Sequence, residues 1–593
     1  APTGPDLTLT TVDTNTYEPL LGCTIGEIGS VAAGMHMCQG RAPLVPAPSA
    51  TAARYRLVDT VVPSARDKDE TSLFDGIDTS LMSLARFAGT RQPDGLVRGL
   101  AVLSSHVAAA REALGKDGPA ATLPELVAGL AAVRGLRAEL PSLVSSDDGR
   151  YEIDSRLNIK EEQFQDALIL AHSLRIDATA NDGLIVAGQP VAITVAVANR
   201  GPGEIGVRGV TLMGFHDQAA CGPAVSSMAA PFSCVAQARI PAQAMLTSPY
   251  WERPENAGRA VFPAGAPFGL PFRPTPFTAV LELEIAGARV THTLPVQFRY
   301  AGAGLVGEKR MELKVVPAFA VSVSPKIAVL PLPAAAPRAS AASQSEDRLR
   351  EVRVTVVNGL KGAASATVRL KTPAGWRVTP TTAAVAFTRE DESVTSRFTV
   401  APPAHVTPGD VDITAEVASA QPSSIDGSPT TFSTGYQVIE YPHIHRRHKL
   451  APAIATLKVM DVAVAPALSV GYVMGVGDLM PPALQQLGAR LTLLDDDELA
   501  WGDLAKYDAI VTGVRAYEHR EDLKANNDRL LKYVENGGTV IVQYNKTEFN
   551  QAQFGPYPIR VSNNRVADEL APVTVLVPDH PVFNYPNKIG SSA

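Results

Sequence analysis

The sequence predicts a multidomain chain of mixed α and β structure: a helical segment, two β-sandwiches and a flavodoxin-like α/β domain at the C-terminal end. Apolar residues recur at steps of three and four over 97–176, and they alternate with polar residues over 177–316 and 317–425. After 461, short apolar runs alternate with helical stretches. With 593 residues, the chain is several times longer than one typical domain, so several hydrophobic cores are expected.

The first region, 1–96, has the mixed pattern of the end of an α/β domain. A helix is expected over the stretch IGEIGSVAAGMHM, because Ile25, Ile28 and Val31 are spaced to form one apolar side. A loop rich in proline and alanine follows this helix.

The same region brings four polar or sulfur-bearing residues close together in sequence: Cys23, His36, Cys38 and Gln39. Two thiolates and an imidazole are ligands that suit zinc, but no fourth ligand is in view. Cys23 falls outside the expected helix, and a cysteine on a packed helix is usually a small buried residue. The metal interpretation is therefore the weaker one.

An apolar stripe runs through the next segment, 97–176, and consists of Leu126, Leu130, Val133, Leu136 and Leu140. The stripe continues in KEEQFQDALILAH with Phe164, Leu168 and Ala171. Thr122 and Glu125, with a proline between them, are spaced as a capping box at the start of a helix. These features predict a small helical bundle or hairpin with a structural role.

Patterns of period two predict a sandwich over 177–316 and a second one over 317–425. In QPVAITVAVANRG, the residues expected on the buried face of a strand are Val191, Ile193, Val195 and Val197. A stretch rich in proline, alanine and serine, PLPAAAPRASAASQSED, is expected to be a solvated loop or a flexible insertion. In REVRVTVVNG, the alternating apolar residues are Val352, Val354 and Val356.

Residues 426–460 are expected to form a linker, and they contain three histidines in the stretch YPHIHRRHKL. Three imidazoles so close together can look like a metal site. In an extended segment, however, His443 and His445 point to one side and His448 to the other, and no carboxylate lies close in sequence. A solvated connector is therefore the favoured interpretation.

The last region, 461–593, alternates strand-like runs such as GGTVIVQYN with helical ones such as LKANNDRLLKYVEN. This alternation predicts parallel strands joined by right-handed crossovers. In such sheets, ligands bind beyond the carboxyl ends of the strands. The polar residues expected at this candidate crevice are Asp478, Arg515, Tyr544 and Asn545. Polar residues in these positions are more commonly helix caps and loop residues.

Composition excludes some classes of function. The formal net charge is -7 and basic residues are not gathered together, so nucleic acid is not an expected partner. No run approaches the roughly 20 apolar residues that span a bilayer, and APTGPDLTLT has neither an initiating Met nor a signal-like stretch. The chain is expected to be soluble and to begin partway through a longer protein. Cys221 and Cys234 could pair in an oxidising compartment.

Several stretches resemble known families. TVDTNTYEPLLGCTIGEIGSVAAGMHMCQG, with SLFDGIDTSL further on, resembles the final part of the large bacterial PIG-L (LmbE-like) deacetylases, in which a late helix carries a His-x-small-Gln-Gly pattern. VRLKTPAGWRVTP resembles the Ig-like module associated with α-galactosidases and other carbohydrate-active enzymes. GYVMGVGD, YDAIVTGVRAY and YVENGGTVIVQYN are similar to the class I glutamine amidotransferase-like domain appended to those deacetylases. Together these resemblances cover nearly the whole chain in order.

The resemblance to PIG-L deacetylases implies a zinc hydrolase that acts on N-acetyl sugars or glycoconjugates. In that family two His and an Asp hold zinc, and an Asp of a His-Pro-Asp-Asp motif acts as the general base toward the metal-bound water. The motif is absent here, since DHPVF at His580 lacks the two carboxylates after the proline. The resemblance therefore implies a non-catalytic C-terminal part whose zinc ligands lie outside this chain, with His36 and Gln39 bordering the substrate pocket. It also implies an extracellular or periplasmic location.

Class I amidotransferases place a nucleophilic cysteine on a sharp turn between a strand and a helix. The corresponding turn here is occupied by Gln543, Tyr544 and Asn545, and all four cysteines precede position 235, so glutaminase activity is not expected. The alternative to a deacetylase part is a non-enzymatic protein that binds carbohydrates or surfaces. In that case Trp251 or Trp376 would stack on sugars, although such residues are more often sandwich core.

Overall fold

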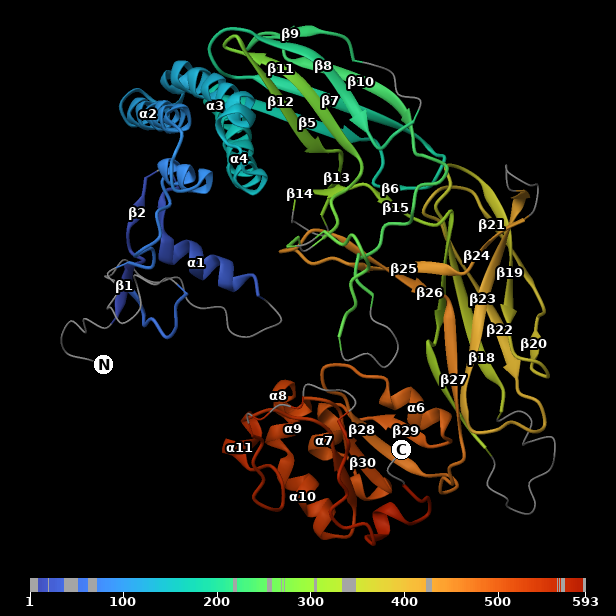
Figure 1. Ribbon diagram of the computed structural model, residues 1–593. Helices are drawn as coiled ribbons and strands as arrows, with labels where there is room; N and C mark the ends of the chain where they lie inside the picture. The colour runs from blue at the N-terminus through green and yellow to red at the C-terminus, as the bar shows by residue number, and fades with distance from the viewer. Residues whose placement is uncertain are drawn as a thin grey trace.

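The structure is a computed structural model in which helices, β-sandwiches and an α/β domain follow one another along the chain (Figure 1). It describes residues 9–19, 21–36, 52–61, 72–216, 221–252, 259–267, 269–270, 272–302, 307–332, 348–422, 429–562, 564, 566 and 571–589. No helix among these residues is long and apolar enough to cross a membrane.

The N-terminal segment contributes little to any hydrophobic core. Its elements are β1 (Thr10–Asp13), β2 (Tyr17–Glu18), β3 (Cys23–Thr24), α1 (Ile25–Gly34) and β4 (Ala52–Tyr55). A capping box starts α1, because Glu27 N donates to the Thr24 hydroxyl and Thr24 N donates to the Glu27 carboxylate. The expected apolar side of α1 is present, but Ile25, Ile28 and Val31 are all exposed. Thr10 alone is buried among the described residues of 9–61.

The helical segment forms as the apolar stripe predicts. Its elements are η2 (Leu81–Ala88), α2 (Asp94–Asp117), η3 (Pro119–Thr122), α3 (Leu123–Leu143) and α4 (Asp147–Ala171). The eight predicted core positions of α3 and α4 are all buried. The predicted capping box is wrong: η3 runs directly into α3, so Thr122 is helical, and its hydroxyl donates to Pro119 O at 2.6 Å. Glu125 instead pairs with His106 Nδ1 at 2.8 Å.

The first sandwich consists of two sheets. One has the order β10 (Phe232–Arg239), β7 (Pro190–Asn199), β5 (Leu174–Ala180), β13 (Gln297–Ala301) and β14 (Glu308–Glu312). The other has the order β12 (Ala288–Pro295), β11 (Thr278–Ile285), β8 (Ile205–Met213) and β9 (Ala224–Ser226). A further short parallel pair consists of β6 (Leu184–Ile185) and β15 (Lys314–Val315). The four residues predicted to face inward from β7 are all buried.

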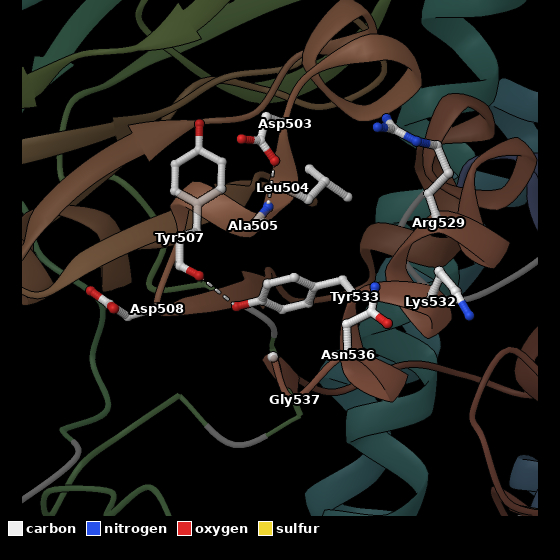
Figure 2. A pocket seen from close by; sticks show the side chains of 11 residues that line it. Asp503, Leu504, Ala505, Tyr507, Asp508, Arg529, Lys532, Tyr533, Asn536 and Gly537 are labelled. Carbon is white, nitrogen blue, oxygen red and sulfur yellow. Dashed lines mark hydrogen bonds between the residues drawn. The ribbon is translucent and has the colours of Figure 1, made fainter.

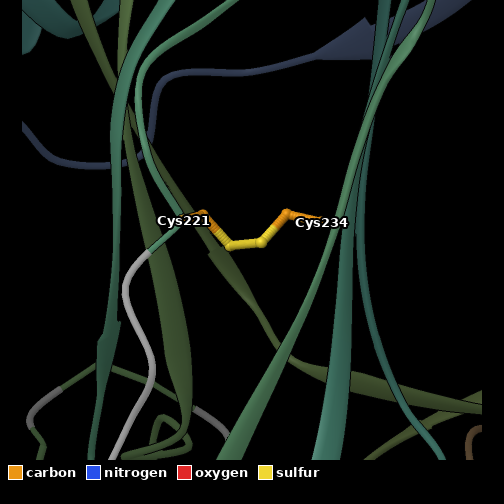
Figure 3. Close-up of a disulfide and its surroundings, with 2 residues drawn as sticks. All are labelled: Cys221 and Cys234. Carbon is orange, nitrogen blue, oxygen red and sulfur yellow. A yellow bond between two sulfur atoms is a disulfide. The ribbon is translucent and has the colours of Figure 1, made fainter.

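A disulfide joins Cys221 to Cys234, with the Cα atoms 6.0 Å apart (Figure 3). Cys234 belongs to β10, and Cys221 forms an isolated bridge with Val210 of β8. The bond therefore ties an edge of one sheet to the other sheet of the sandwich. The pairing that the sequence left open is present in the structure.

The helical segment and the first sandwich share one hydrophobic cluster that runs from Leu84 to Val315. Polar contacts fix the same junction. Gln165 Oε1 on α4 accepts from Thr291 N of β12 at 2.7 Å, and Arg134 of α3 donates to Arg289 O at 2.9 Å. Because of this continuous packing, the predicted boundary near 176 does not separate two independent cores.

The second sandwich has a hydrophobic cluster of its own, centred on Phe319 and Phe398. One sheet has the order β16 (Phe319–Ser324), β18 (Arg350–Asn358), β22 (Ser393–Ala401) and β20 (Arg377–Thr379). The other has the order β17 (Ile327–Pro331), β27 (Ile454–Met460), β23 (Gly409–Pro422), β19 (Ala364–Lys371) and β21 (Ala383–Phe387), with β24 (Pro429–Phe432) beside β23.

The expected linker over 426–460 is not a solvated connector. It contains β24, a hairpin of β25 (Thr434–Ile439) and β26 (Arg447–Pro452), and β27, which pairs with both β17 and β23 inside the second sandwich. His448 on β26 is buried and stacks on Tyr436 with ring centroids 4.7 Å apart. The physical reason is long-range strand pairing, which places the alternating apolar residues of β27 in the core.

The described residues of the terminal domain form four parallel strands, as the alternation of strands and helices predicts. Their order is β29 (Arg490–Leu493), β28 (Ser469–Val473), β30 (Ala509–Thr512) and β31 (Thr539–Val542). The helices are α6 (Met480–Gln486), α7 (Asp496–Trp501), η4 (Leu504–Lys506), α8 (Ala516–His519), α9 (Glu521–Ala525), α10 (Asn527–Glu535), α11 (Glu548–Ala552) and η5 (Pro581–Phe583). Val470 and Tyr472 belong to one apolar cluster and Val473 to another, so both faces of the sheet are covered.

Candidate functional site

The carboxyl ends of the terminal strands bring the predicted crevice residues to one edge of the sheet. Asp478, beyond β28, accepts from the Tyr472 hydroxyl at 2.8 and 2.9 Å and from Met480 N at 3.0 Å. Gln543 Nε2 donates to the same hydroxyl at 2.7 Å. Burial, and then the Asp478 carboxylate, raise the pKa of Tyr472. Asp478 therefore anchors a buried tyrosine.

Arg515 is similarly occupied. Its backbone is left-handed, with φ 58°, and its N–H donates to Tyr544 O at 2.7 Å. Its guanidinium donates to both oxygens of Glu518, at 2.5 and 2.7 Å, and Lys546 lies 3.2 Å from the same carboxylate. The hydrogen bond from Arg515 lowers the pKa of Glu518 to about 2. This edge therefore carries an ion cluster in which two cations share the one carboxylate of Glu518.

Tyr544 and Asn545 occupy the turn after β31, where the amidotransferase-like resemblance places a nucleophile. Tyr544 is exposed, and Asn545 is buried with Nδ2 donating to Gln543 O at 2.9 Å. Asn545 Oδ1 and the Thr512 hydroxyl are buried without a hydrogen-bond partner among the described residues. The edge thus offers two polar groups with unused hydrogen-bonding capacity, and its acids are paired.

A cavity in this domain opens at the opposite edge, beside the amino ends of β30 and β31 (Figure 2). Its volume is about 480 Å³, and its walls include Asp503, Tyr507, Arg529 and Tyr533. Tyr533 Oη donates to Tyr507 O at 2.8 Å, and Arg529 donates to Gly502 O at 2.6 Å. Burial raises the pKa of both tyrosines. These side chains hold the loop around η4 in place, and the sequence did not predict this cavity.

A larger cavity, of about 910 Å³, lies between the second sandwich and the terminal domain. Its walls are residues of β17 and β18, the segment 462–464, and α6 with the turn that follows. Hydrogen bonds cross between the units here, among them one from Val329 N to Gln486 Oε1 at 2.5 Å and one from Arg350 to Gln486 O at 3.2 Å. The volume falls within the range of small-molecule sites.

Among the described residues, three arginines and one acid are the charged residues that line this larger cavity: Arg348, Arg350, Arg353 and Glu351. Arg353 donates to Glu351 at 2.6 Å, and Arg350 Nε donates to Val329 O at 2.9 Å. Arg348 makes long bonds to the carbonyls of Ala404 and Pro403, at 3.5 and 3.3 Å. Its Nε is buried without a partner among the described residues. The described part of the lining is therefore positively charged, and the Arg348 Nε–H has unused donor capacity that suits a carboxylate, sulfate or carbonyl oxygen.

Sequence reasoning missed this arginine cluster. The signal was present in the stretch RLREVR, where three guanidinium groups fall within six residues. Strand alternation explained Val352 and Val354, and it gave the arginines of this stretch no role. The packing of α6 against β17 decides which of these arginines face the terminal domain. This packing leaves no local pattern in the sequence.

The other predicted positions lie apart from these cavities. His36 is exposed and follows α1, while Cys38 and Gln39 lie outside the described residues. Trp251 is partly exposed, and Trp376 packs against the core of the second sandwich. Among the described residues, no three His, Cys, Asp or Glu side chains gather in a way that could hold a metal ion.

Comparison with known proteins identifies one module. Residues 345–419 match the family model of the NPCBM-associated, NEW3 domain of alpha-galactosidase. The matched stretch contains the three arginines of the larger cavity and the strands β18, β19 and β22. A carbohydrate-associated accessory module is therefore part of this multidomain chain. No curated protein sequence matches the chain.

Three similar solved structures each cover about a quarter of the chain. A FixG-related protein from Vibrio parahaemolyticus is 9% identical and covers 23% of this chain and 97% of its own, with a TM-score of 0.13. WR4, a C. elegans MSP family member, is 9% identical over 24% of this chain and 97% of its own, with a TM-score of 0.12. The Calx CBD1 domain is 14% identical and covers 25% of this chain and 100% of its own, with a TM-score of 0.14. TM-scores this low support no argument about function.

Proposed function

We propose that this chain is the accessory, non-catalytic part of an exported carbohydrate-active protein, and that its larger cavity binds a glycan. The observation that carries the proposal is the position of Arg348, Arg350 and Arg353, which lie inside the NEW3 match and line a cavity of about 910 Å³. Guanidinium groups donate well to sugar carboxylates and to the carbonyl of an N-acetyl group. Glutamine amides of α6 supply further donors and acceptors for hydroxyl groups.

The parent activity that fits best is PIG-L-type deacetylation of N-acetyl sugars or glycoconjugates. The sequence resemblance is the basis of this part of the proposal, and two structural features support it. The apolar side of α1 has no cover among the described residues, which is suited to packing against a further domain. The strand order of the terminal domain equals the flavodoxin-like order over four strands.

Zinc belongs to the parent family in this proposal, and the residues of this chain do not fit it. The sequence lacks a His-Pro-Asp-Asp motif, and the described residues gather no ligand set. In this proposal, the modules of this chain bind and orient a glycan. Export is supported by the Cys221–Cys234 disulfide, which is stable in an oxidising compartment.

Glycan binding is tested by calorimetry on the intact chain, with N-acetylglucosamine oligomers and oligogalacturonate as separate probes. We expect Arg348→Gln to weaken binding about tenfold, because a charged hydrogen bond contributes roughly 1.5–3 kcal/mol. The matched control is Arg377→Gln, an exposed arginine on β20 of the same module and outside the cavity wall. If neither probe binds, or if both variants bind equally, the proposed glycan site is wrong.

The parent activity needs a separate test. A His-Pro-Asp-Asp motif encoded in frame upstream of Ala1 would support the deacetylase, and a signal peptide joined directly to Ala1 would contradict it. For this chain alone we expect no zinc-dependent release of acetate from N-acetylglucosamine substrates. Stoichiometric zinc together with turnover would show that catalytic residues are present after all.

A non-enzymatic surface-binding protein is the second candidate, and the exposed part of Trp251 favours it. This residue precedes Glu252, which forms an isolated β-bridge with Val261. An indole presented in this way can stack on a sugar ring. If Trp251→Ala abolishes glycan binding and Arg348→Gln does not, the glycan-binding site is on the first sandwich and not in the larger cavity.

A further inference from the structure

The helical segment contains a cavity that the glycan proposal does not use. α3 packs along both α2 and α4, and η2 lies against α2 and α4. η2 inserts Leu84 and Ala85, which are buried, and the Arg156 guanidinium of α4 covers the Phe87 ring at 4.7 Å. The 3-10 turn thus fills part of the space between the two outer helices. Beyond Leu81 that space stays open as a cavity of about 720 Å³.

The cavity walls follow the helical repeat. On α2 they are formed by positions 104, 107, 110 and 114, which are three or four residues apart and so share one face, together with 111 beside them. α4 contributes the opposite wall from Lys160 to Ala171, and Leu126 of α3 packs at the floor with Phe164. From 104 to 114, at 1.5 Å per residue, the wall is about 15 Å long. The cavity is therefore elongated and mostly apolar.

The charged residues of the lining have one sign. Among the described residues of the lining they are Arg111 on α2 and Lys160 on α4, toward opposite ends of the cavity, and these residues include no aspartate or glutamate. Lys160 Nζ donates to Gln163 Oε1 at 2.8 Å, and neither cation has an ion pair among the described residues. A ligand that filled this space would bury apolar surface and would gain from a negative charge at its end.

We propose that this cavity binds a single-chain anionic amphiphile, with the alkyl tail between α2 and α4 and the carboxylate at one end of the cavity, at Arg111 or at Lys160. The volume is in the range of small-molecule sites, which are mostly apolar with a few polar groups that fix orientation. An extended dodecanoyl chain is similar in length to the wall. The proposal does not depend on glycan binding, because the glycan cavity lies between the second sandwich and the terminal domain.

The test uses the intact chain with dodecanoate and the neutral analogue dodecanol, both below their aggregation limits, in a fluorescence displacement assay. We expect dodecanoate to bind about tenfold more tightly than dodecanol, since one charged hydrogen bond accounts for that ratio. The double variant Arg111→Gln/Lys160→Gln should remove this difference and leave dodecanol binding unchanged. Equal affinity of the two probes for the original chain, or no binding of either, would overturn the proposal and favour a polypeptide occupant.

A second arm of the experiment fills the cavity with a larger side chain. Ala167→Phe should abolish the binding of both probes, because Ala167 lines the cavity and a phenyl ring would occupy it. Ala138→Phe, at an exposed position of α3 outside the lining, is the matched control and should bind as the original chain does. Circular dichroism melting shows whether Ala167→Phe folds. If it does not, the charge variants decide, since neither Arg111 nor Lys160 belongs to the buried core.

Discussion

Two junctions in this molecule are built differently. Where the helical segment meets the first sandwich, one apolar cluster runs across the boundary. At the same boundary, Gln165 Oε1 accepts a hydrogen bond from Thr291 N. Where the second sandwich meets the terminal domain, the clusters are separate and hydrogen bonds through Gln486 cross the gap. This second junction encloses a cavity of about 910 Å³. Shared apolar packing makes one folding unit, whereas polar contact between separate cores leaves room for a ligand.

The largest expected effect is at the shared core. Leu168→Ala removes a fully buried side chain of α4, and we expect the free energy of unfolding to fall by about 3 kcal/mol from lost burial and the cavity left behind. Because the cluster is continuous, the helices and the first sandwich should melt together, with no change in the second sandwich. Calorimetry resolves the transitions. Leu170→Ala, two residues away and exposed, is the control and should change stability by less than about 0.5 kcal/mol.

The disulfide gives the next effect. Replacing Cys221 and Cys234 by alanine should lower the stability of the first sandwich by roughly 2–4 kcal/mol, because the unfolded chain regains the freedom of the closed loop. Thermal melting with and without a reducing agent measures this loss. The reducing agent should shift the melting of the original chain and leave the variant unchanged. If the melting of the terminal domain shifted instead, the hydrophobic cores of the first sandwich and the terminal domain would not be independent.

Periodic patterns predicted the parts of the fold that depend on local sequence. The stripe from Leu126 to Leu140 is buried in α3, and Ile193 faces the core from β7 together with its valine neighbours at alternate positions. The parallel terminal strands are also present. In the helix and the strand, burial follows from a spacing that can be counted in the sequence.

The candidate sites were predictable only in part. The carboxyl edge gathers Asp478, Arg515, Tyr544 and Asn545 because parallel strands end at the same side of a sheet. Their partners were not predictable, since the choice of Tyr472 for Asp478 depends on side-chain directions within the folded core. Contacts between segments far apart in the sequence, such as the pairing of β27 with β17 or the packing of α6 beside β18, leave no local pattern.

Acid should weaken the hairpin that the linker prediction missed. Burial, and then the nearby Arg446, lower the pKa of His448 to about 4. The unfolded chain binds this proton near pH 6.5, so stability is present above that value and is lost as the pH falls toward 4. We expect a loss of about 2 kcal/mol at pH 5, which His448→Phe should remove while keeping the stack on Tyr436. Urea unfolding at pH 7 and pH 5 measures the difference. An equal loss in the variant would assign the pH dependence to other groups.

The smallest effect sharpens the comparison at the polar junction. Gln486→Ala removes the acceptor of Val329 N, and we expect stability to change by about 1 kcal/mol or less, because each domain keeps its own core. The local effect should be larger than the global one: hydrogen exchange at the Val329 amide should accelerate while exchange within β28 and β30 stays slow. Gln485→Ala, at a neighbouring position that also lines the cavity, is the control and should leave the Val329 amide protected. A glycan bound in the cavity should slow exchange of the Val329 amide further in the original chain and by less in Gln486→Ala, because the ligand and Gln486 close the same gap.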